Sequence, residues 1–320
     1  MGAYVRPFPR VVRIEPAAAC NLACRHCPTG TVDMKRGLMS EAVFDAALRA
    51  LERHRDAVKV VVLYHGGEPL MNKAFPAMIR RIKALGIPFV KTVSNGMLLT
   101  ETASRDLLAS GLDALEISLD AQTEAQNDFV RRKSNYAQVV ANIRRFVDLR
   151  AACDHPTPRL DLSSTQFLSP ATLDQRSGPV SPPAHLLRDF GAELAAGTIG
   201  LKLHWAMRWP HMEVDEGEFD VFLDDQGEDL NTCDHVDSTV TIRAEGDVVA
   251  CCYDLTSRLV LGNILETDLA EIWNGPGYLG LREGIATKSY PSPCDNCNTV
   301  RRNAYLVPRA PQLVGGLAED

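Results

Sequence analysis

Along the first two thirds of the chain, short apolar runs alternate with stretches in which apolar residues recur at helical spacing. The runs are rich in Val, Ile and Leu with little polar alternation, as in parallel strands that are covered on both faces. Six such runs predict strands at residues 11–18, 58–65, 89–95, 114–120, 160–168 and 199–209. Strands that alternate with helices are typical of an α/β fold with a parallel sheet.

The stretches between these strands predict helices, and capping residues support their ends. Ser40 and Thr100 stand where helix N-caps are preferred, and Gly86, Gly111 and Gly197 stand where helices stop. The predicted helices cover residues 41–55, 73–85, 101–110, 135–150 and 184–196. Right-handed crossovers join such units, and six units are fewer than the eight of a closed barrel. We therefore expect an α/β fold that is a partial (β/α)6 TIM barrel.

The pattern changes after Pro210. An acidic stretch leads to a predicted β-hairpin at 238–254 with the turn sequence AEGD, then to a short helix at 269–273 and a Cys-x-x-Cys pair at 294–297. These features predict a small second module. The expected division is a barrel at 8–212, an acidic linker at 213–231, the second module at 232–302 and a loosely ordered tail at 303–320.

Composition narrows the class of protein. The 320 residues are 45% hydrophobic and 23% charged, as in an ordinary globular protein. No apolar run reaches the roughly 18 residues that span a bilayer, and the N-terminus lacks the apolar core of a signal peptide. We therefore expect a cytoplasmic protein that has no membrane partner, and disulfides are rare in that compartment. The nine cysteines are then core thiols or metal ligands.

The net charge of −7 is concentrated in one stretch. Residues 213–229 hold nine acidic and no basic side chains. The basic footprint of a nucleic-acid-binding protein is absent, so we expect no nucleic-acid partner. The acidic stretch is either a solvated linker or an acidic rim that attracts a cationic substrate.

Three cysteines follow the first predicted strand directly. Cys20, Cys24 and Cys27 have the spacing C-x3-C-x2-C. Zinc sites favour paired C-x2-C knuckles with four ligands. Three thiolates on one loop instead suit an iron–sulfur cluster that has one iron without a protein ligand. The loop follows a barrel strand, at the end where such folds hold their chemistry.

The segment CNLACRHC at 20–27 resembles the radical S-adenosylmethionine (radical SAM) superfamily. The resemblance continues in HGGEPL, SNG and ISLDA, each at the end of a predicted strand and in the order of the family. It implies a 4Fe–4S cluster whose open iron binds the amino and carboxylate groups of S-adenosylmethionine. The cofactor-binding residues that these motifs imply are His26, Gly66, Gly67, Glu68, Ser94, Asn95, Ser118, Asp120 and Arg131.

The resemblance also implies roles for some of these residues. The Gly66–Gly67 backbone and Glu68 would meet the amino group of S-adenosylmethionine. Ser118 and Arg131 would hold its carboxylate, although Arg132 replaces a glycine of the family pattern and leaves the choice between the two arginines open. His26 would pack on adenine, or is an ordinary surface histidine.

A second set of cysteines lies in the C-terminal module. Their spacing, with GNI and LAEIWN between them, resembles the shortened "twitch" form of the SPASM domain. That resemblance implies one auxiliary 4Fe–4S cluster, and zinc is the alternative. The expected ligands of this cluster are Cys233, Cys251, Cys294 and Cys297.

Cys252 lies directly after one of these ligands. Neighbouring side chains of a strand point to opposite faces, so Cys252 would face the barrel mouth if Cys251 faces the cluster. We expect Cys252 to be catalytic. The alternatives are a small buried thiol, or an exchange of roles between Cys251 and Cys252.

By resemblance, a flavodoxin- or ferredoxin-type reductant supplies one electron, and a 5′-deoxyadenosyl radical takes hydrogen from a substrate carbon. Relatives with twitch domains act on sugars and aminocyclitols in antibiotic pathways. We expect epimerisation of such a small molecule, with Cys252 as the hydrogen donor.

One alternative is a dehydrogenase that makes a ketone, with the auxiliary cluster as electron acceptor. Another is a peptide maturase, although the first strand starts by about residue 11 and leaves no room for a leader-binding domain. Two non-enzymatic alternatives each explain only part of the motifs: a ferredoxin-like electron carrier, and a binding module held together by zinc.

Overall fold

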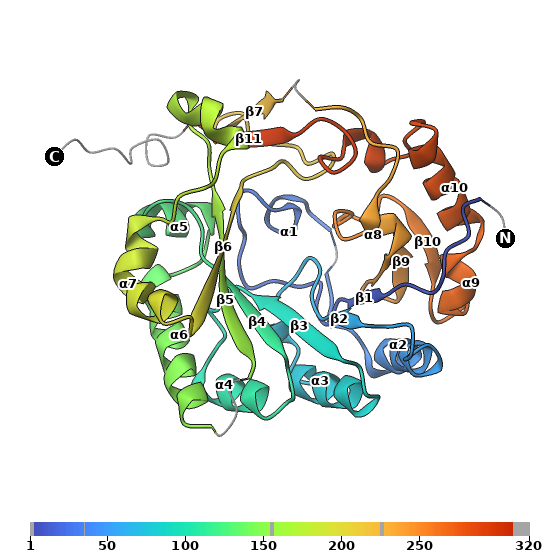
Figure 1. Cartoon of the computed structure of the whole chain (residues 1–320), viewed down its shortest axis with the longest axis horizontal. Coiled ribbons are helices and arrows are strands. Elements are labelled where there is room, and N and C mark those ends of the chain that lie inside the picture. Colours follow the sequence, from blue (N-terminus) through green and yellow to red (C-terminus); the bar gives the residue numbers. More distant parts are fainter. Residues whose placement is uncertain (1–2, 35, 154–156, 225–226, 310–320) are drawn as a thin grey trace.

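The computed structural model describes residues 3–34, 36–153, 157–224 and 227–309. Its centre is a nine-stranded sheet in the order β10-β9-β8-β1-β2-β3-β4-β5-β6 (Figure 1). The six predicted barrel strands are confirmed, and each pairs in parallel with the next. They are β1 (Val11–Ile14), β2 (Val60–Val62), β3 (Phe89–Ser94), β4 (Ala114–Ser118), β5 (Arg159–Gln166) and β6 (Ile199–Trp205).

Five predicted helices are confirmed and lie outside the sheet (Figure 1). The side chains of Ser40 and Thr100 accept N-cap hydrogen bonds, and Gly86, Gly111 and Gly197 have positive φ at helix ends. These helices are α2 (Glu41–Arg53), α3 (Phe75–Ala84), α4 (Glu101–Leu108), α6 (Tyr136–Ala151) and α7 (Ala184–Ala195). Their buried faces, with Phe44, Phe75 and Phe146, form one core with the strands. No helix in the described part of the chain is long and apolar enough to cross a membrane.

Short helical segments, which the sequence did not predict, lie near the strand ends. They are α1 (Pro28–Thr31), η1 (Pro69–Met71), α5 (Glu124–Val130) and η2 (Pro170–Ser177). Thr123 caps α5 by accepting a hydrogen bond from Gln126 N. A helix of seven residues makes only two turns, which is too short for apolar periodicity to identify.

The C-terminal module continues the barrel sheet. The predicted hairpin is confirmed as antiparallel β8 (Thr239–Ile242) and β9 (Asp247–Val249), and β8 also pairs in parallel with β1. The predicted short helix is confirmed as α9 (Leu269–Trp273). The remaining elements are α8 (Asp234–Asp237), β10 (Val260–Asn263), α10 (Pro276–Ala286) and η3 (Cys294–Asn296). The two modules therefore share one sheet.

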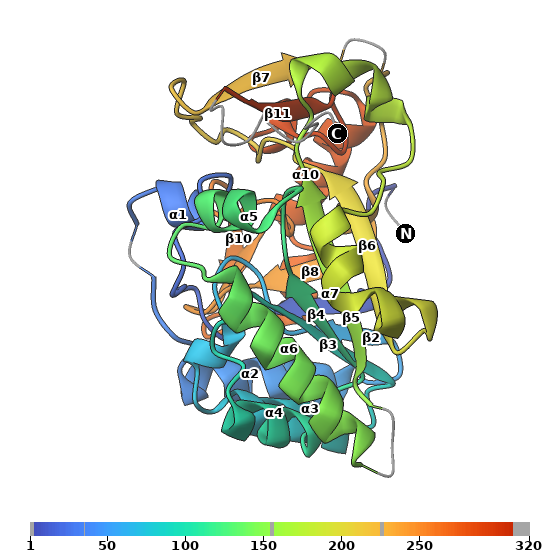
Figure 2. The same cartoon turned by 90° about the vertical axis from the view of Figure 1, so that its left-hand side faces the viewer.

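Two expectations about the C-terminal third are wrong. Strand β7 (Phe219–Leu223) lies in the expected linker, and β11 (Ala304–Pro308) lies in the expected tail. The two strands form a separate antiparallel pair above the barrel mouth (Figure 2). All five residues of β11 are buried. Leu306 packs in one cluster with Phe219, and Tyr305 and Val307 pack in another with Leu168. Residues 225–226 of the expected linker and 310–320 of the expected tail lie outside the described residues.

Candidate active site

A cavity of about 560 Å³ lies at the carboxyl ends of the barrel strands. This is the end at which barrel enzymes carry their chemistry. The cavity brings together every residue that the sequence predicted for cofactor binding, the first cysteine set and Cys252. The predicted residues in its wall are Cys20, Cys24, His26, Cys27, Gly66, Gly67, Glu68, Ser94, Asn95, Ser118, Asp120, Arg131 and Cys252.

The first three cysteines lie on the loop between β1 and α1. Backbone hydrogen bonds hold this loop against the end of α5, from Ala23 N to Arg132 O at 3.0 Å and from Arg25 N to Val130 O at 2.9 Å. All three thiols are half-buried and reach the same cavity. Three soft thiols on one wall of an open cavity fit a 4Fe–4S cluster that has one iron left for another ligand.

Glu68 joins the loops that follow β2 and β3. Its carboxylate accepts hydrogen bonds from Ser94 Oγ at 2.9 Å, Asn95 N at 2.7 Å and Leu70 N at 3.0 Å. Burial raises the pKa of Glu68. A carboxylate offers about four acceptor sites, so one site, on Oε2, has no protein donor in the described structure. The sequence did not predict this second role of Glu68, in which it fixes the SNG turn.

Asp120 and Arg131 form a buried ion pair in the cavity wall. Arg131 Nη1 lies 2.6 Å from Asp120 Oδ2, and His26 Nε2 lies 3.4 Å from the same oxygen. Burial opposes ionisation of Asp120, but the Arg131 charge holds the pKa of that carboxyl well below its usual range. Arg131 caps the end of α5 and reaches this cavity, whereas Arg132 is exposed and lines a different hollow.

The second cysteine set is buried beside the barrel. Cys233, Cys251, Cys294 and Cys297 are each 5–8% exposed. Backbone N–H groups point at two of the sulfurs, from Tyr253 N to Cys251 Sγ and from Thr299 N to Cys297 Sγ, both at 3.4 Å. No three His, Cys, Asp or Glu side chains among the described residues are placed around a single metal ion. Four soft thiols in one buried region suit a cluster, in which each thiolate binds its own iron.

Cys252 differs from Cys251 in the space it reaches. Cys252 lines the cavity and its sulfur lies 3.5 Å from His235 Nδ1, whereas Cys251 is buried and does not line the cavity. Both residues lie in the turn after β9 (Asp247–Val249) and not in a strand, so the strand alternation expected from the sequence does not apply to them. What distinguishes them is that only Cys252 lines the cavity.

The sequence did not identify most of the remaining wall. Hydroxyl, imidazole and aromatic side chains dominate it. They are Tyr64, Ser163, Thr165, His204, Trp205, Trp209, His235 and Tyr253. Arg13 and Glu116 also line the cavity and carry a visible signal, because each is a charged residue inside an apolar strand.

Every carboxylate that lines the cavity has protein partners. Glu116 accepts from Lys91 at 3.0 Å and Lys202 at 2.8 Å, and Glu68 and Asp120 are bonded as described above. Arg13 and Arg208 have no carboxylate partner within the described residues, since Arg13 bonds Tyr64 O and Arg208 bonds Asn296 Oδ1. The cavity therefore offers no unpaired acid to a cation.

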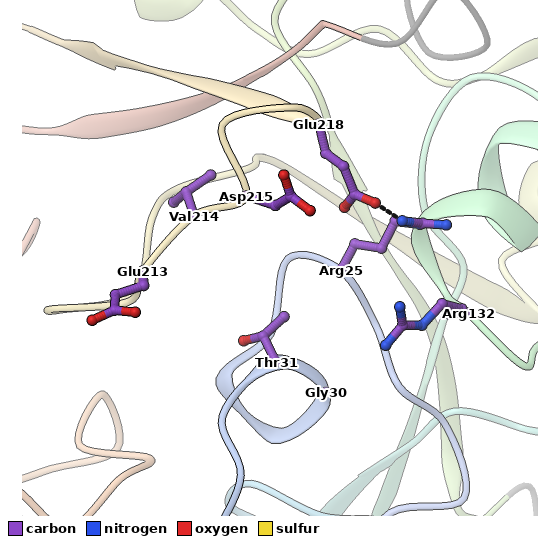
Figure 3. A pocket seen from close by; sticks show the side chains of 8 residues that line it. All are labelled: Arg25, Gly30, Thr31, Arg132, Glu213, Val214, Asp215 and Glu218. Atoms are coloured by element: carbon purple, nitrogen blue, oxygen red, sulfur yellow. Dashed lines mark ion pairs between the residues drawn. The ribbon is translucent and has the colours of Figure 1, made fainter.

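The acidic stretch lines a separate hollow of about 380 Å³ next to the cysteine loop. Figure 3 shows Glu213, Asp215 and Glu218 across from Arg25 and Arg132, with an ion pair between Arg25 and Glu218. These acids do not line the main cavity. The idea of an acidic rim at the substrate cavity therefore has no support in this arrangement.

Comparison with protein families matches residues 14–153 to the radical SAM superfamily and residues 233–298 to an iron–sulfur cluster-binding domain, SPASM. The GTP 3′,8-cyclase of Peptoclostridium acidaminophilum is 29% identical over 138 residues, which are 42% of this chain and 41% of that protein. The chain thus spans about two fifths of that relative. The PqqA peptide cyclase of Xanthomonas euvesicatoria is 23% identical over 337 residues, covering 92% of this chain and 81% of that protein.

Among solved structures, BtrN in complex with AdoMet and 2-DOIA has the same fold. It matches with a TM-score of 0.60 and 17% identity, and the match covers 92% of this chain and 95% of that one. The two matched domains imply S-adenosylmethionine and 4Fe–4S clusters as cofactors, one cluster that binds S-adenosylmethionine and one auxiliary cluster. The chain therefore contains a radical SAM domain, followed by a SPASM-type iron–sulfur cluster-binding domain.

Proposed function

We propose that this radical SAM enzyme inverts a carbon centre of a carbohydrate- or aminocyclitol-type small molecule, with Cys252 as the hydrogen donor. The observation that carries the proposal is the position of Cys252. Its thiol lines the same cavity as the cysteine loop, while its neighbour Cys251 is buried outside that cavity.

The cavity wall has suitable groups for the cofactors. Cys20, Cys24 and Cys27 would hold the first cluster, and the second set of cysteines the auxiliary cluster. The Gly67 backbone and the remaining acceptor site of Glu68 suit an ammonium group. Arg131 suits a carboxylate, because a guanidinium presents a fork of donors, and Ser118 adds a hydroxyl. We assign the carboxylate to Arg131 rather than Arg132, because Arg132 lines a different hollow.

Once bound, the first cluster and S-adenosylmethionine supply a 5′-deoxyadenosyl radical, which removes a hydrogen atom from the substrate. The Cys252 S–H bond then breaks and a C–H bond forms at the substrate carbon. The stereocentre inverts when Cys252 reaches the face from which hydrogen was not taken. The thiyl radical that remains needs one electron and one proton; the external one-electron reductant supplies the electron and solvent supplies the proton.

The substrate half of the cavity favours a neutral, hydroxylated ring. Ser163 and Thr165 offer hydroxyls that both donate and accept. Trp209 and Tyr253 add aromatic faces, with ring centroids 5.5 Å apart. Since every lining carboxylate has a protein partner, we do not propose a polycationic substrate.

Replacing Cys252 by Ala tests the proposal. With a panel of hexoses, aminocyclitols and glycosides, the wild-type enzyme should give an epimer that carries one solvent deuterium when the reaction runs in D2O. The Cys252→Ala enzyme should still release 5′-deoxyadenosine but give no epimer. Cys153→Ala is the control, because Cys153 is an exposed thiol. Undiminished epimer from Cys252→Ala would rule out the thiol donor.

A peptide substrate is the second candidate. The PqqA peptide cyclase matches 92% of this chain, far more than the cyclase acting on GTP. A peptide product, or an oxidised small-molecule product that forms equally well without Cys252, would replace epimerisation by maturation or dehydrogenation.

A further inference from the structure

Two buried side chains of opposite charge meet where the barrel joins the SPASM domain. Glu15 follows β1 and Arg243 follows β8, the strand paired with β1. Their exposures are 0% and 2%, and Arg243 Nε lies 3.1 Å from Glu15 Oε2. Breaking such a pair is costly, but a buried pair is weak evidence for stability alone. The geometry that it fixes is therefore the informative feature.

Each member of the pair has further partners in the SPASM domain. Glu15 Oε2 accepts from Ala244 N at 3.2 Å, and Arg243 Nη1 donates to Leu255 O at 3.2 Å and Ser257 Oγ at 2.6 Å. The second carboxylate oxygen, Oε1, accepts from Gly66 N at 2.8 Å. A continuous set of hydrogen bonds thus runs from the SPASM loop at 255–257, through Arg243 and Glu15, to the Gly66–Gly67 turn of the cavity.

The turn is held on its other sides as well. Thr29 Oγ1 donates to Gly66 O at 2.5 Å, and His65 Nε2 lies 3.3 Å from Asp254 O of the SPASM domain. Burial lowers the pKa of His65 to about 3, so this imidazole is neutral. A Cβ at Gly67 would overlap the carbonyl oxygens of Ala17 and Ala19, so only glycine fits there.

Within the described structure, the N–H and C=O of Gly67 have no protein partner, and Gly67 lines the cavity. Half-buried backbone groups of this kind need a partner from water or a ligand. Their direction is set by the Gly66 peptide, whose N–H is held by Glu15 and whose C=O is held by Thr29.

We propose that Glu15 and Arg243 are positioning residues for S-adenosylmethionine, which fix the Gly66–Gly67 turn and make the SPASM domain part of the cofactor site. The inference rests on the proposed binding of the amino-acid end of S-adenosylmethionine at this turn. Neither side chain lines the cavity, so both act through the backbone of Gly66.

The test compares reconstituted holoenzymes with Glu15→Gln, Arg243→Gln and both substitutions together. Arg282→Gln is the matched control, since Arg282 is another buried arginine of the SPASM domain, 3% exposed, that bonds the Val236 and Trp273 carbonyls and not the turn. The readouts are the Kd of S-adenosylmethionine by equilibrium dialysis, the change that S-adenosylmethionine causes in the EPR signal of the reduced first cluster, and the unfolding midpoint.

Each single substitution should weaken binding by about tenfold, which corresponds to about 1.4 kcal/mol, and should reduce the EPR change. The double variant should bind S-adenosylmethionine about as well as the single variant that binds it less tightly, because the effects of substitutions at residues that act as one unit do not add. Arg282→Gln should lower the unfolding midpoint and leave the Kd unchanged. Arg243→Lys keeps a cation beside Glu15 but cannot bond Leu255 and Ser257 together, and should weaken binding less than Arg243→Gln.

A wild-type Kd and EPR change in folded Glu15→Gln and Arg243→Gln would overturn the inference, as would an equal loss in Arg282→Gln. If the Gln variants do not fold, a wild-type Kd in Arg243→Lys together with an unfolding midpoint as low as that of Arg282→Gln would overturn it too. Those outcomes leave the epimerase proposal intact, because that proposal depends on the product formed by Cys252→Ala and not on the Kd.

Discussion

The two cysteine sets show two ways to build a cluster site. The first set comes from a single loop, Cys20 to Cys27, and stays half-exposed in the wall of the large cavity. The second set comes from the N-cap of α8, the turn after β9 and the two ends of η3, spans more than sixty residues of the chain, and is buried. A loop that supplies three thiols leaves room for a ligand, whereas a site closed by four buried thiols leaves none. We therefore expect the first set to hold the cluster that reacts with a ligand, and the second set to hold a cluster that stores or passes electrons.

The largest expected effect comes from removing a thiol of the first set. Cys24→Ala should abolish release of 5′-deoxyadenosine while leaving about four of about eight irons bound. The unfolding midpoint should fall by less than loss of the second cluster causes, because the loop stays bonded to the end of α5 through Ala23 and Arg25. Iron analysis, product chromatography and calorimetry under anaerobic conditions measure the three quantities. A variant that unfolds would show that the first set is structural as well, and would break the contrast.

The second set should respond in the opposite way. Cys297→Ala should lose the auxiliary cluster and with it the stabilisation that a tightly bound group gives the folded state, about 3 kcal/mol. A chain of this size should then unfold about 4–5 °C earlier. Release of 5′-deoxyadenosine should persist at a reduced rate. Thermal unfolding, compared between this variant and Cys153→Ala, provides the measurement, and an unchanged midpoint would contradict the structural role of the second set.

The change with the smallest effect on the clusters sharpens the comparison at the barrel mouth. Leu306 of β11 is fully buried and packs in one cluster with Phe219 of β7, above the cavity. Leu306→Ala should lower the free energy of unfolding by about 2–5 kcal/mol with both clusters retained. Chemical denaturation and iron analysis test it. A change below about 0.5 kcal/mol would mean that β11 behaves as the loose tail that the sequence suggested.

Features whose interacting residues are close together in the sequence could be predicted, and features whose interacting residues are far apart in the sequence could not. The barrel strands, the caps at Ser40 and Thr100, and the cysteine loop are local patterns, so the sequence identifies them. The choice between Arg131 and Arg132 was not readable, because a two-turn helix, α5, decides which of the two faces the cavity. The Glu15–Arg243 pair was missed because its members are 228 residues apart.

Strand β11 was missed for a related reason. Its five residues include a proline and stand near the end of the sequence, so they look like part of a loosely ordered tail. Only the pairing with β7 shows that they form a strand. The acidic stretch misled in a different way, since its charges pointed to the substrate cavity but line a neighbouring hollow.

The parallel pairing of β8 with β1 has a consequence for how such an enzyme can be divided. Strand β1 has a neighbour on both sides, β2 and β8. Cutting the chain before residue 232 would strip one side of β1 and leave a row of bare amide and carbonyl groups, the template on which sheets of different molecules join. The SPASM domain thus covers an edge through which barrels could associate. A barrel produced without it would need that exposed edge of β1 to be blocked before it could stay in solution.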